Sequence, residues 1–160
     1  MMNKRDVKIL LVDDEPDILE IVGYNLKNKG YQVYTANNGV EALKSAKKIT
    51  PNLILLDIMM PEMDGIETCE KIRAIKSLEN TLIAFLTARN EDYSQVAGFD
   101  AGADDYITKP IKPKVLISKV KSLLRRLKAS SQRDSIVEVG NITVNREEYL
   151  VLKDKEKIIL

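Results

Sequence analysis

The chain has 160 residues, of which 44% are hydrophobic and 31% are charged, and its net charge is +1. This length and composition suit a globular protein with one domain of ordinary size and part of a second. The single cysteine and the absence of histidine exclude an intramolecular disulfide, a thiolate metal cluster, histidine-based triads and histidine-ligated zinc. No apolar run approaches the roughly 18 residues of a membrane helix, and the polar N-terminus is no signal peptide, so we expect a cytoplasmic protein without a membrane partner.

The hydrophobic pattern alternates between short apolar runs and segments with a helical stripe. The clearest run is Leu53–Asp57, which lies between two prolines and predicts a strand buried on both faces. Strands are predicted at Val7–Val12, Tyr31–Ala36, Leu53–Asp57, Thr81–Leu86 and Asp105–Thr108. Helices are predicted from Pro16 to a stop at Gly30, from the turn Asn37–Gly39 to Ile49, from the cap Asp64–Gly65 to Ile75, at Glu91–Ala103 and at Pro113–Ala129.

This succession of strands and helices predicts an α/β fold. Five consecutive strand–helix units form a doubly wound five-stranded parallel sheet between two layers of helices. The alternating segment Tyr31–Ala36 suits an edge of that sheet, and the helix Glu91–Ala103 buries so little apolar surface that it is a candidate for motion. No glycine-rich dinucleotide or P-loop motif is present, so neither kind of nucleotide binding is supported.

The last part of the chain changes in character and in charge. Residues 1–110 carry 13 basic and 18 acidic side chains, whereas residues 111–160 carry 12 and 6. Residues 129–135 are small and polar and predict a linker. Residues 136–160 alternate β-branched and polar residues around Gly140-Asn141, which predicts antiparallel strands. Because 25 such residues cannot bury a core of their own, we interpret them as the beginning of a second domain.

Reactive or cation-binding side chains stand at the ends of the predicted strands. Asp13 and Asp14 follow the first strand, Asp57 ends the third, and Thr87 and Lys109 end the fourth and fifth. The carboxyl ends of parallel strands share one edge of the sheet, where ligands usually bind, so we expect the five side chains to converge. Two carboxylates 4 Å apart repel by about 4 kcal/mol at an effective dielectric constant of 20. A hard divalent cation such as Mg²⁺ would relieve that repulsion.

This group of side chains suits phosphoryl transfer. An aspartate beside Mg²⁺ is a competent nucleophile toward a phosphoryl group, and Asp57 is the candidate. The metal and the Lys109 ammonium would neutralise the transferring oxygens, and the Thr87 hydroxyl could donate a hydrogen bond to the product. The alternative is that Lys109 simply pairs with a buried aspartate in a stabilising ion cluster. The agreement of five positions in residue type and strand end favours the chemical interpretation.

Four motifs give the chain a specific resemblance to a known family. They are Asp13-Asp14, Asp57-x-x-Met60-Pro61-x-Met63-Asp64-Gly65, Leu86-Thr87-Ala88 and Gly102-Ala103-Asp104-Asp105-Tyr106-Ile107-Thr108-Lys109-Pro110. In these motifs the chain resembles the receiver domain of bacterial two-component response regulators, from residue 7 to about residue 128. The resemblance implies a receiver domain at residues 1–128 with a flavodoxin-like sheet of strand order 2-1-3-4-5.

The resemblance also implies roles for individual residues at the metal site. Asp57 would be the phosphoacceptor. Asp14, Asp57 and the backbone carbonyl of Met59 would ligate Mg²⁺ directly, and Asp13 would act mainly through water. Such a protein accepts a phosphoryl group and slowly loses it, and it is not otherwise an enzyme.

Three further residues follow from the family pattern. Thr87 and Tyr106 would form the pair that switches conformation on phosphorylation, and Lys109 would be the counter-charge of the phosphoryl group. The Lys109–Pro110 peptide bond would be cis. The resemblance implies that a sensor histidine kinase donates the phosphoryl group. The donor histidine must lie on that partner, because this chain has no histidine.

The C-terminal residues 136–160 narrow the resemblance to the OmpR/PhoB type. Residues 136–160 resemble the N-terminal sheet of a winged-helix DNA-binding domain, whose recognition helix and wing are not in this sequence. The expected function is therefore a phosphorylation-controlled transcription regulator that binds DNA only through that effector domain. A stand-alone signalling or phosphorelay receiver is the alternative. A phosphatase of the haloacid dehalogenase type would need an aspartate two residues after the nucleophile, where this chain has Met59.

Phosphorylation is also expected to promote a homodimer. The expected face comprises the 91–103 helix, the strand at Tyr106 and the 113–129 helix. In the subfamily that the chain resembles, one ion pair is usual on this face, and it is missing here because the matching positions are Gln95 and Val115. The candidate contact residues are Val96, Phe99, Asp100, Asp104, Asp105, Ile117, Lys119, Lys121 and Arg126.

Overall fold

The computed structural model describes residues 3–88 and 100–140, and it describes side chains as far as residue 127. The chain divides into two compact units, residues 1–124 and 125–160. The sheet and the candidate site belong to the first unit. In the second unit the structure describes helical backbone up to Gly140, with side chains only for residues 125–127. Within the described ranges, no helix is long and apolar enough to span a bilayer.

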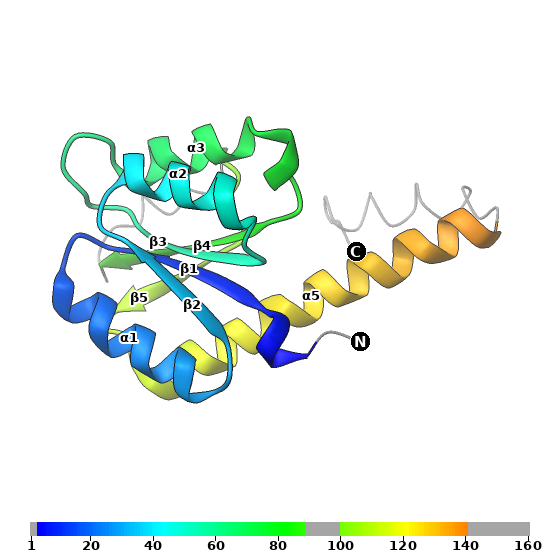
Figure 1. Ribbon diagram of the computed structural model, residues 1–160, viewed down its shortest axis with the longest axis horizontal. Coiled ribbons are helices and arrows are strands. Elements are labelled where there is room, and N and C mark those ends of the chain that lie inside the picture. Colours follow the sequence, from blue (N-terminus) through cyan, green and yellow to red (C-terminus); the bar gives the residue numbers. More distant parts are fainter. Residues whose placement is uncertain (1–2, 89–99, 141–160) are drawn as a thin grey trace. The chain divides into compact units, whose positions relative to one another are not determined.

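The first unit is built on a parallel sheet of five strands (Figure 1). The strand order is β2-β1-β3-β4-β5, which confirms the predicted doubly wound, flavodoxin-like fold. The strands are β1 (Lys8–Val12), β2 (Gln32–Ala36), β3 (Leu53–Asp57), β4 (Leu82–Ala88) and β5 (Asp105–Lys109). The helices are α1 (Pro16–Asn28), α2 (Gly39–Ile49), α3 (Gly65–Arg73) and α5 (Pro113–Gly140), with short 3-10 turns at Lys4–Asp6 and Lys76–Leu78.

The central strands are buried on both faces because both faces of the sheet are covered by helices. In β3, Ile54 and Leu56 pack into the cluster that includes residues of α2 and α3, whereas Leu53 and Leu55 pack into the cluster that includes residues of α1 and α5. The alternation follows the two-residue period of a strand. All five residues of β3 are buried, which explains why this run is continuously apolar until Asp57.

Local capping fixes the start of α3 close to the end of β3. The Asp64 carboxylate accepts a hydrogen bond from the Glu67 N–H at 2.9 Å, as an N-cap residue does. The Gly65 N–H donates to the Ile58 carbonyl at 2.9 Å. A Cβ atom at Gly65 would collide with the backbone carbonyl of Asp57. Glycine at this position therefore allows the helix to approach the strand end that carries the central aspartate.

One of the predicted elements toward the C-terminus differs from the structure, and another cannot be compared with it. The helix predicted at 91–103 falls largely in residues 89–99, which are outside the described residues; Asp100 is helical. Helix α5 continues through residues 129–140, where a linker and the start of a strand were predicted. No glycine or proline interrupts the chain between Pro113 and Gly140, so small polar residues alone do not end the helix there. Residues 141–160 are outside the described residues, and the division into domains stays a prediction.

Candidate functional site

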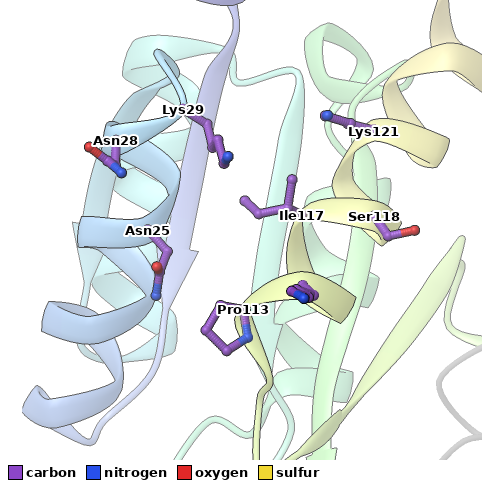
Figure 2. Close-up of a pocket in the computed structure, with 8 residues that line it drawn as sticks. Asn25, Asn28, Lys29, Pro113, Ile117, Ser118 and Lys121 are labelled. Atoms are coloured by element: carbon purple, nitrogen blue, oxygen red, sulfur yellow. The ribbon is translucent and has the colours of Figure 1, made fainter.

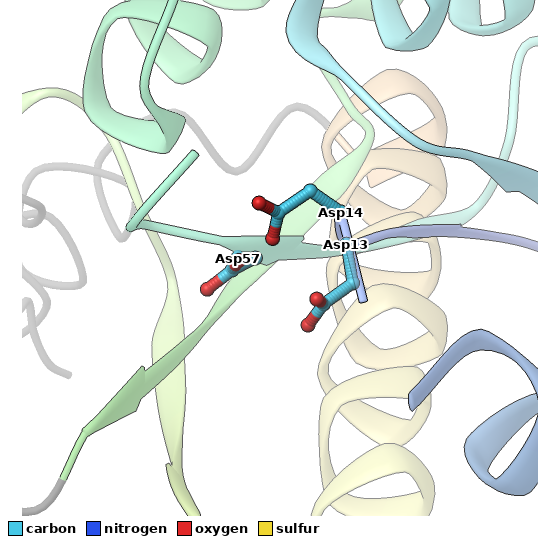
Figure 3. Close-up of side chains that lie close together, drawn as sticks. All are labelled: Asp13, Asp14 and Asp57. Atoms are coloured by element: carbon cyan, nitrogen blue, oxygen red, sulfur yellow. The ribbon is translucent and has the colours of Figure 1, made fainter. Parts of the chain in front are cut away.

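The structure brings Asp13, Asp14 and Asp57 together at the carboxyl edge of the sheet (Figure 3). One carboxylate oxygen of each lies within 4.8 Å of those of the other two. Asp13 and Asp14 directly follow β1, and Asp57 is the last residue of β3, the strand that pairs with β1. The convergence expected from parallel strands is therefore present for all three carboxylates.

Lys109 reaches this group from the end of β5. Its Nζ lies 3.1 Å from Asp13 Oδ2 and 3.3 Å from Asp57 Oδ1, to which it donates a hydrogen bond. A third carboxylate, that of Glu15, lies 3.5 Å from the same Nζ. We refer to Asp13, Asp14, Glu15, Asp57 and Lys109 as the carboxyl-edge site. With every group ionised, the site holds four carboxylates and one ammonium, so it has an excess of negative charge.

The carboxylates differ in exposure. Asp13 is fully buried, and its Oδ1 accepts a hydrogen bond from the Glu15 N–H at 2.9 Å. Its Oδ2 forms the ion pair with Lys109 but has no partner with hydrogen-bond geometry. Asp57 is 2% exposed, whereas Asp14 is exposed. The site therefore has two buried carboxylates, Asp13 and Asp57, and two exposed ones, Asp14 and Glu15.

Burial and mutual repulsion perturb the ionisation of the central aspartate. Burial raises the pKa of Asp57 to about 7, and the charge of Asp13 contributes in the same direction, against the opposing effect of Lys109. For Lys109, burial alone would lower the pKa, but the carboxylates of Asp57 and Asp13 outweigh it and raise the pKa. The ammonium thus stays charged, and one ammonium does not compensate the buried carboxylates.

The donor set fits a hard divalent cation. All the converging ligands are oxygens, and three of them come from carboxylates within 4.8 Å of one another. The buried Asp13 Oδ2 without a hydrogen bond and the raised pKa of Asp57 both indicate negative charge that the protein itself does not neutralise. These observations agree with the expected Mg²⁺. For Met59, it is the backbone N–H that contacts Asp57 Oδ1, at 3.3 Å, and its side chain is exposed.

Thr87 and Tyr106 lie on the same face of two neighbouring strands. Thr87 pairs with Thr108 in the register of β4 and β5, and Tyr106 is two residues before Thr108. Thr87 is buried and its hydroxyl donates to the Ala88 carbonyl at 3.3 Å. The Tyr106 ring is partly buried against the cluster that includes residues of α2 and α3. The two predicted switch residues are thus neighbours in the sheet, and the Lys109–Pro110 bond is cis.

The acidic residues of the expected dimer face have partners within the chain. Asp104 forms an ion pair with Arg73 at 2.8 Å and accepts a hydrogen bond from the Ile83 N–H at 2.9 Å. Asp105 forms an ion pair with Lys119 at 3.2 Å. The Lys119 ammonium also lies 5.9 Å from the centre of the Tyr106 ring.

The remaining candidate residues of the expected dimer face lie in different places or are outside the described residues. Val96 and Phe99 are outside the described residues, Asp100 is exposed, and Arg126 is exposed in the second unit. Ile117 and Lys121 line a groove between α1 and α5, with a volume of about 500 Å³ (Figure 2). In Figure 2 both side chains point toward α1. These two residues therefore contribute to the α1 side of α5.

Two residues of structural importance were not predicted from the sequence. Glu15 contacts Lys109, and the only signal for it was its place as the third acid in the run Asp13–Glu15. Arg73 donates hydrogen bonds to the carbonyls of Thr81 and Gly102 at 2.6 and 2.8 Å, besides its ion pair with Asp104. Its position in the last turn of α3 gives no local signal for these contacts.

Comparison with known proteins gives one family and closely similar folds. The response regulator receiver domain family matches residues 9–121. The alkaline phosphatase synthesis transcriptional regulatory protein PhoP of Bacillus subtilis is 48% identical over 125 residues, which cover 78% of this chain and 50% of that protein. The transcriptional regulatory protein SrrA of Staphylococcus aureus is 36% identical over 159 residues, covering 96% of this chain and 65% of that protein. The chain thus spans between half and two thirds of the length of these relatives.

Solved structures agree with the sequence relatives. The chemotaxis protein CheY4 of Vibrio cholerae is similar with a TM-score of 0.71 and 32% identity, covering 73% of this chain and 98% of that one. A two-component response regulator from Clostridium difficile has a TM-score of 0.71 and 34% identity, covering 76% of this chain and 98% of that one. The shared fold therefore extends over nearly the whole of both solved chains and about three quarters of this chain.

Proposed function

The chain belongs to the response regulator receiver domain family, of the OmpR/PhoB type, and from this premise we propose that it is a switch controlled by phosphorylation of Asp57. The resemblance predicted from the sequence is thereby confirmed. The observation that carries the proposal is the position of Asp57. Its carboxylate ends the central strand, faces the Lys109 ammonium at 3.3 Å and shares a cluster with Asp13 and Asp14.

In the proposed reaction an Asp57 oxygen attacks the phosphorus of a phosphohistidine on a partner kinase. A P–O bond forms to Asp57, the P–N bond breaks, and the histidine of the kinase takes up a proton. The attacking group must be the carboxylate, because a protonated acid is a poor nucleophile. With a pKa of about 7, Asp57 is only partly ionised at neutral pH unless a further positive charge enters the site.

Asp14, Asp57 and the backbone carbonyl of Met59 would hold Mg²⁺, with Asp13 acting mainly through water. The cation would supply charge neutralisation for the carboxylates and for the transferring phosphoryl oxygens. Lys109 neutralises the phosphoryl group from the β5 side, and the buried Asp13 keeps its ammonium in place. The exposed Asp14 leaves this edge of the sheet open to a donor.

The phosphoryl group would then change the conformation of neighbouring residues. It brings a charge of about −1.5 to −2, which can accept a hydrogen bond from the Thr87 hydroxyl. Movement of Thr87 would free space on the sheet face that it shares with Tyr106, and Tyr106 could turn inward. Tyr106 lies beside the Asp105–Lys119 ion pair, so its movement would reach the face that we propose for dimerisation.

We place the switch in transcription control, because PhoP and SrrA are transcriptional regulatory proteins. In this proposal a sensor histidine kinase supplies the phosphoryl group, and the phosphorylated chain dimerises and acts on DNA through an effector domain. The 160 residues themselves would bind DNA weakly and without sequence preference. Although residues 112–128 carry seven basic side chains and no acid, they have no aromatic residue for base stacking.

The test is phosphorylation by acetyl phosphate in the presence of Mg²⁺, followed by intact mass measurement. We expect the wild-type chain to gain one phosphoryl group and Asp57→Asn to gain none, because the amide has the same shape but cannot form the acyl phosphate. Asp17→Asn, at an exposed acid in the first turn of α1, is the matched control and should react like wild type. A phosphoryl group on Asp57→Asn would overturn the assignment.

A further inference from the structure

Three carboxylates lie within ion-pair distance of the Lys109 ammonium. An ammonium has three N–H donors, and among the described residues the ion-pair partners of Lys109 are Asp13, Asp57 and Glu15. The distances are 3.1, 3.3 and 3.5 Å in that order. The proposed function gives Lys109 a further acceptor, the phosphoryl group on Asp57. Four acceptors then share three N–H donors, so the phosphoryl group competes with the existing contacts.

Glu15 is the partner that can yield. The side chains of Asp13 and Asp57 are 0% and 3% exposed, whereas that of Glu15 is 62% exposed, and water can replace its contact with Lys109. Its contact is also the longest of the three. Glu15 stands at the N-cap of α1 but makes no capping hydrogen bond with its side chain. The helix start therefore does not require this carboxylate to point where it does.

Resting on the proposed function, we infer that Glu15 is a positioning residue that competes with the phosphoryl group for Lys109. In the resting chain its carboxylate lies within ion-pair distance of the ammonium and adds a negative charge to the carboxyl-edge site. On phosphorylation it gives way, and the Lys109 ammonium turns toward a phosphoryl oxygen. Glu15 thus sets how readily the site accepts a phosphoryl group, without touching the reacting atoms.

The first measurement is an equilibrium without turnover. Beryllofluoride, a stable stand-in for the phosphoryl group, is titrated into the chain with saturating Mg²⁺ and followed by fluorine NMR. Glu15→Gln keeps the size of the side chain and removes its charge, and we expect it to bind about two- to five-fold more tightly than wild type, the scale of an exposed ion pair. The gain should shrink as salt is raised from about 0.01 M to 1 M, because the competing contact is exposed.

The second measurement is the rate of phosphorylation by acetyl phosphate, which should rise by a similar factor in Glu15→Gln. Asp17→Asn is the control for general charge, because Asp17 is exposed on the same helix start and is not a partner of Lys109. It should leave both measurements near wild type.

The outcomes separate this inference from the proposed function. If wild type takes up beryllofluoride and Glu15→Gln binds it no more tightly, the competition is refuted while the phosphoacceptor site stands. An equal gain in Asp17→Asn would also refute it, since the effect would then be one of net charge. A wild-type chain that takes up neither beryllofluoride nor a phosphoryl group would overturn the proposed function and this inference with it.

Discussion

Charged groups are arranged in opposite ways at the carboxyl-edge site and on the β5–α5 face, by which we mean Asp105, Tyr106 and Lys119. At the carboxyl-edge site several carboxylates share one ammonium, two of them are buried, and burial raises the pKa of Asp57 to about 7. On the β5–α5 face one acid meets one base, and their side chains are 25% and 39% exposed. The first region has an excess of acids and two buried carboxylates, whereas the second has one acid and one base that are both partly exposed.

This difference indicates what each region can do. An unbalanced buried cluster has free energy to gain from a cation or from neutralisation, so ligands and pH should change its stability strongly. A balanced exposed pair has little to gain or lose, and it can exchange partners cheaply. The carboxyl-edge site is thus suited to chemistry, and the β5–α5 face is suited to a reversible contact between copies.

The largest effect should come from Asp57→Asn in the absence of metal. The folded pKa of about 7 lies above the ordinary value of 3.8, so the contribution of Asp57 to stability is fully present below about pH 4 and is lost as pH rises through 7. Over that range the wild type should lose up to about 4 kcal/mol of unfolding free energy that the amide does not lose, and about 2.7 kcal/mol of this falls between pH 5 and pH 8. Urea denaturation at pH 5 and pH 8 with a chelator measures it, and equal losses in both chains would contradict the account.

Mg²⁺ should stabilise the wild-type chain against urea. At a concentration 100 times its dissociation constant, a ligand of the folded state adds about 2.7 kcal/mol to the unfolding free energy. Asp14→Asn should remove most of this gain without harming the fold, because Asp14 is exposed. Glu20→Gln, another exposed acid, is the control and should keep the gain. A full gain in Asp14→Asn would show that the cation binds elsewhere.

Arg73 provides an intermediate case, because it is partly buried and balanced. Its guanidinium satisfies Asp104 and the carbonyls of Thr81 and Gly102. Arg73→Met keeps much of the packing but leaves these acceptors without their donor, at an expected cost of about 2 kcal/mol. Thermal or urea unfolding tests this at pH 7. A loss below about 0.5 kcal/mol would mean that water replaces the arginine.

The smallest effect should come from the β5–α5 face. Lys119→Ala should lower the unfolding free energy by less than about 1 kcal/mol, because its pair with Asp105 is partly exposed. The same change should weaken the dimer that we expect in beryllofluoride. Sedimentation of both chains, with and without beryllofluoride, compares them. A wild-type chain that stays monomeric at high concentration would count against dimerisation.

The fold and the centre of the site could be predicted because both depend on strongly local signals. Leu53–Asp57 is continuously apolar until its last residue, and parallel strands must place their carboxyl ends on one edge. Those two facts suffice to bring Lys109 to Asp57, although 52 residues separate them.

Contacts that depend on the reach of a side chain could not be predicted. The Glu15 contact requires β5 to present Lys109 across the end of β1, and the Arg73 contacts join α3 to residues 8 to 31 positions further along. The end of α5 was misplaced for a different reason. Ala129, Ser130 and Ser131 are tolerated in a helix, so a polar composition alone did not locate its end.

The most direct test of the central claim is to locate the phosphoryl group itself. The chain is treated with acetyl phosphate and Mg²⁺ and then with borohydride, which reduces an aspartyl phosphate to homoserine, and its peptides are sequenced by mass spectrometry. We expect homoserine at position 57, with Asp13 and Asp14 unchanged and no homoserine when Mg²⁺ is omitted at neutral pH. Homoserine at Asp13 or Asp14, or a phosphoryl group on a hydroxyl side chain with Asp57 intact, would contradict it.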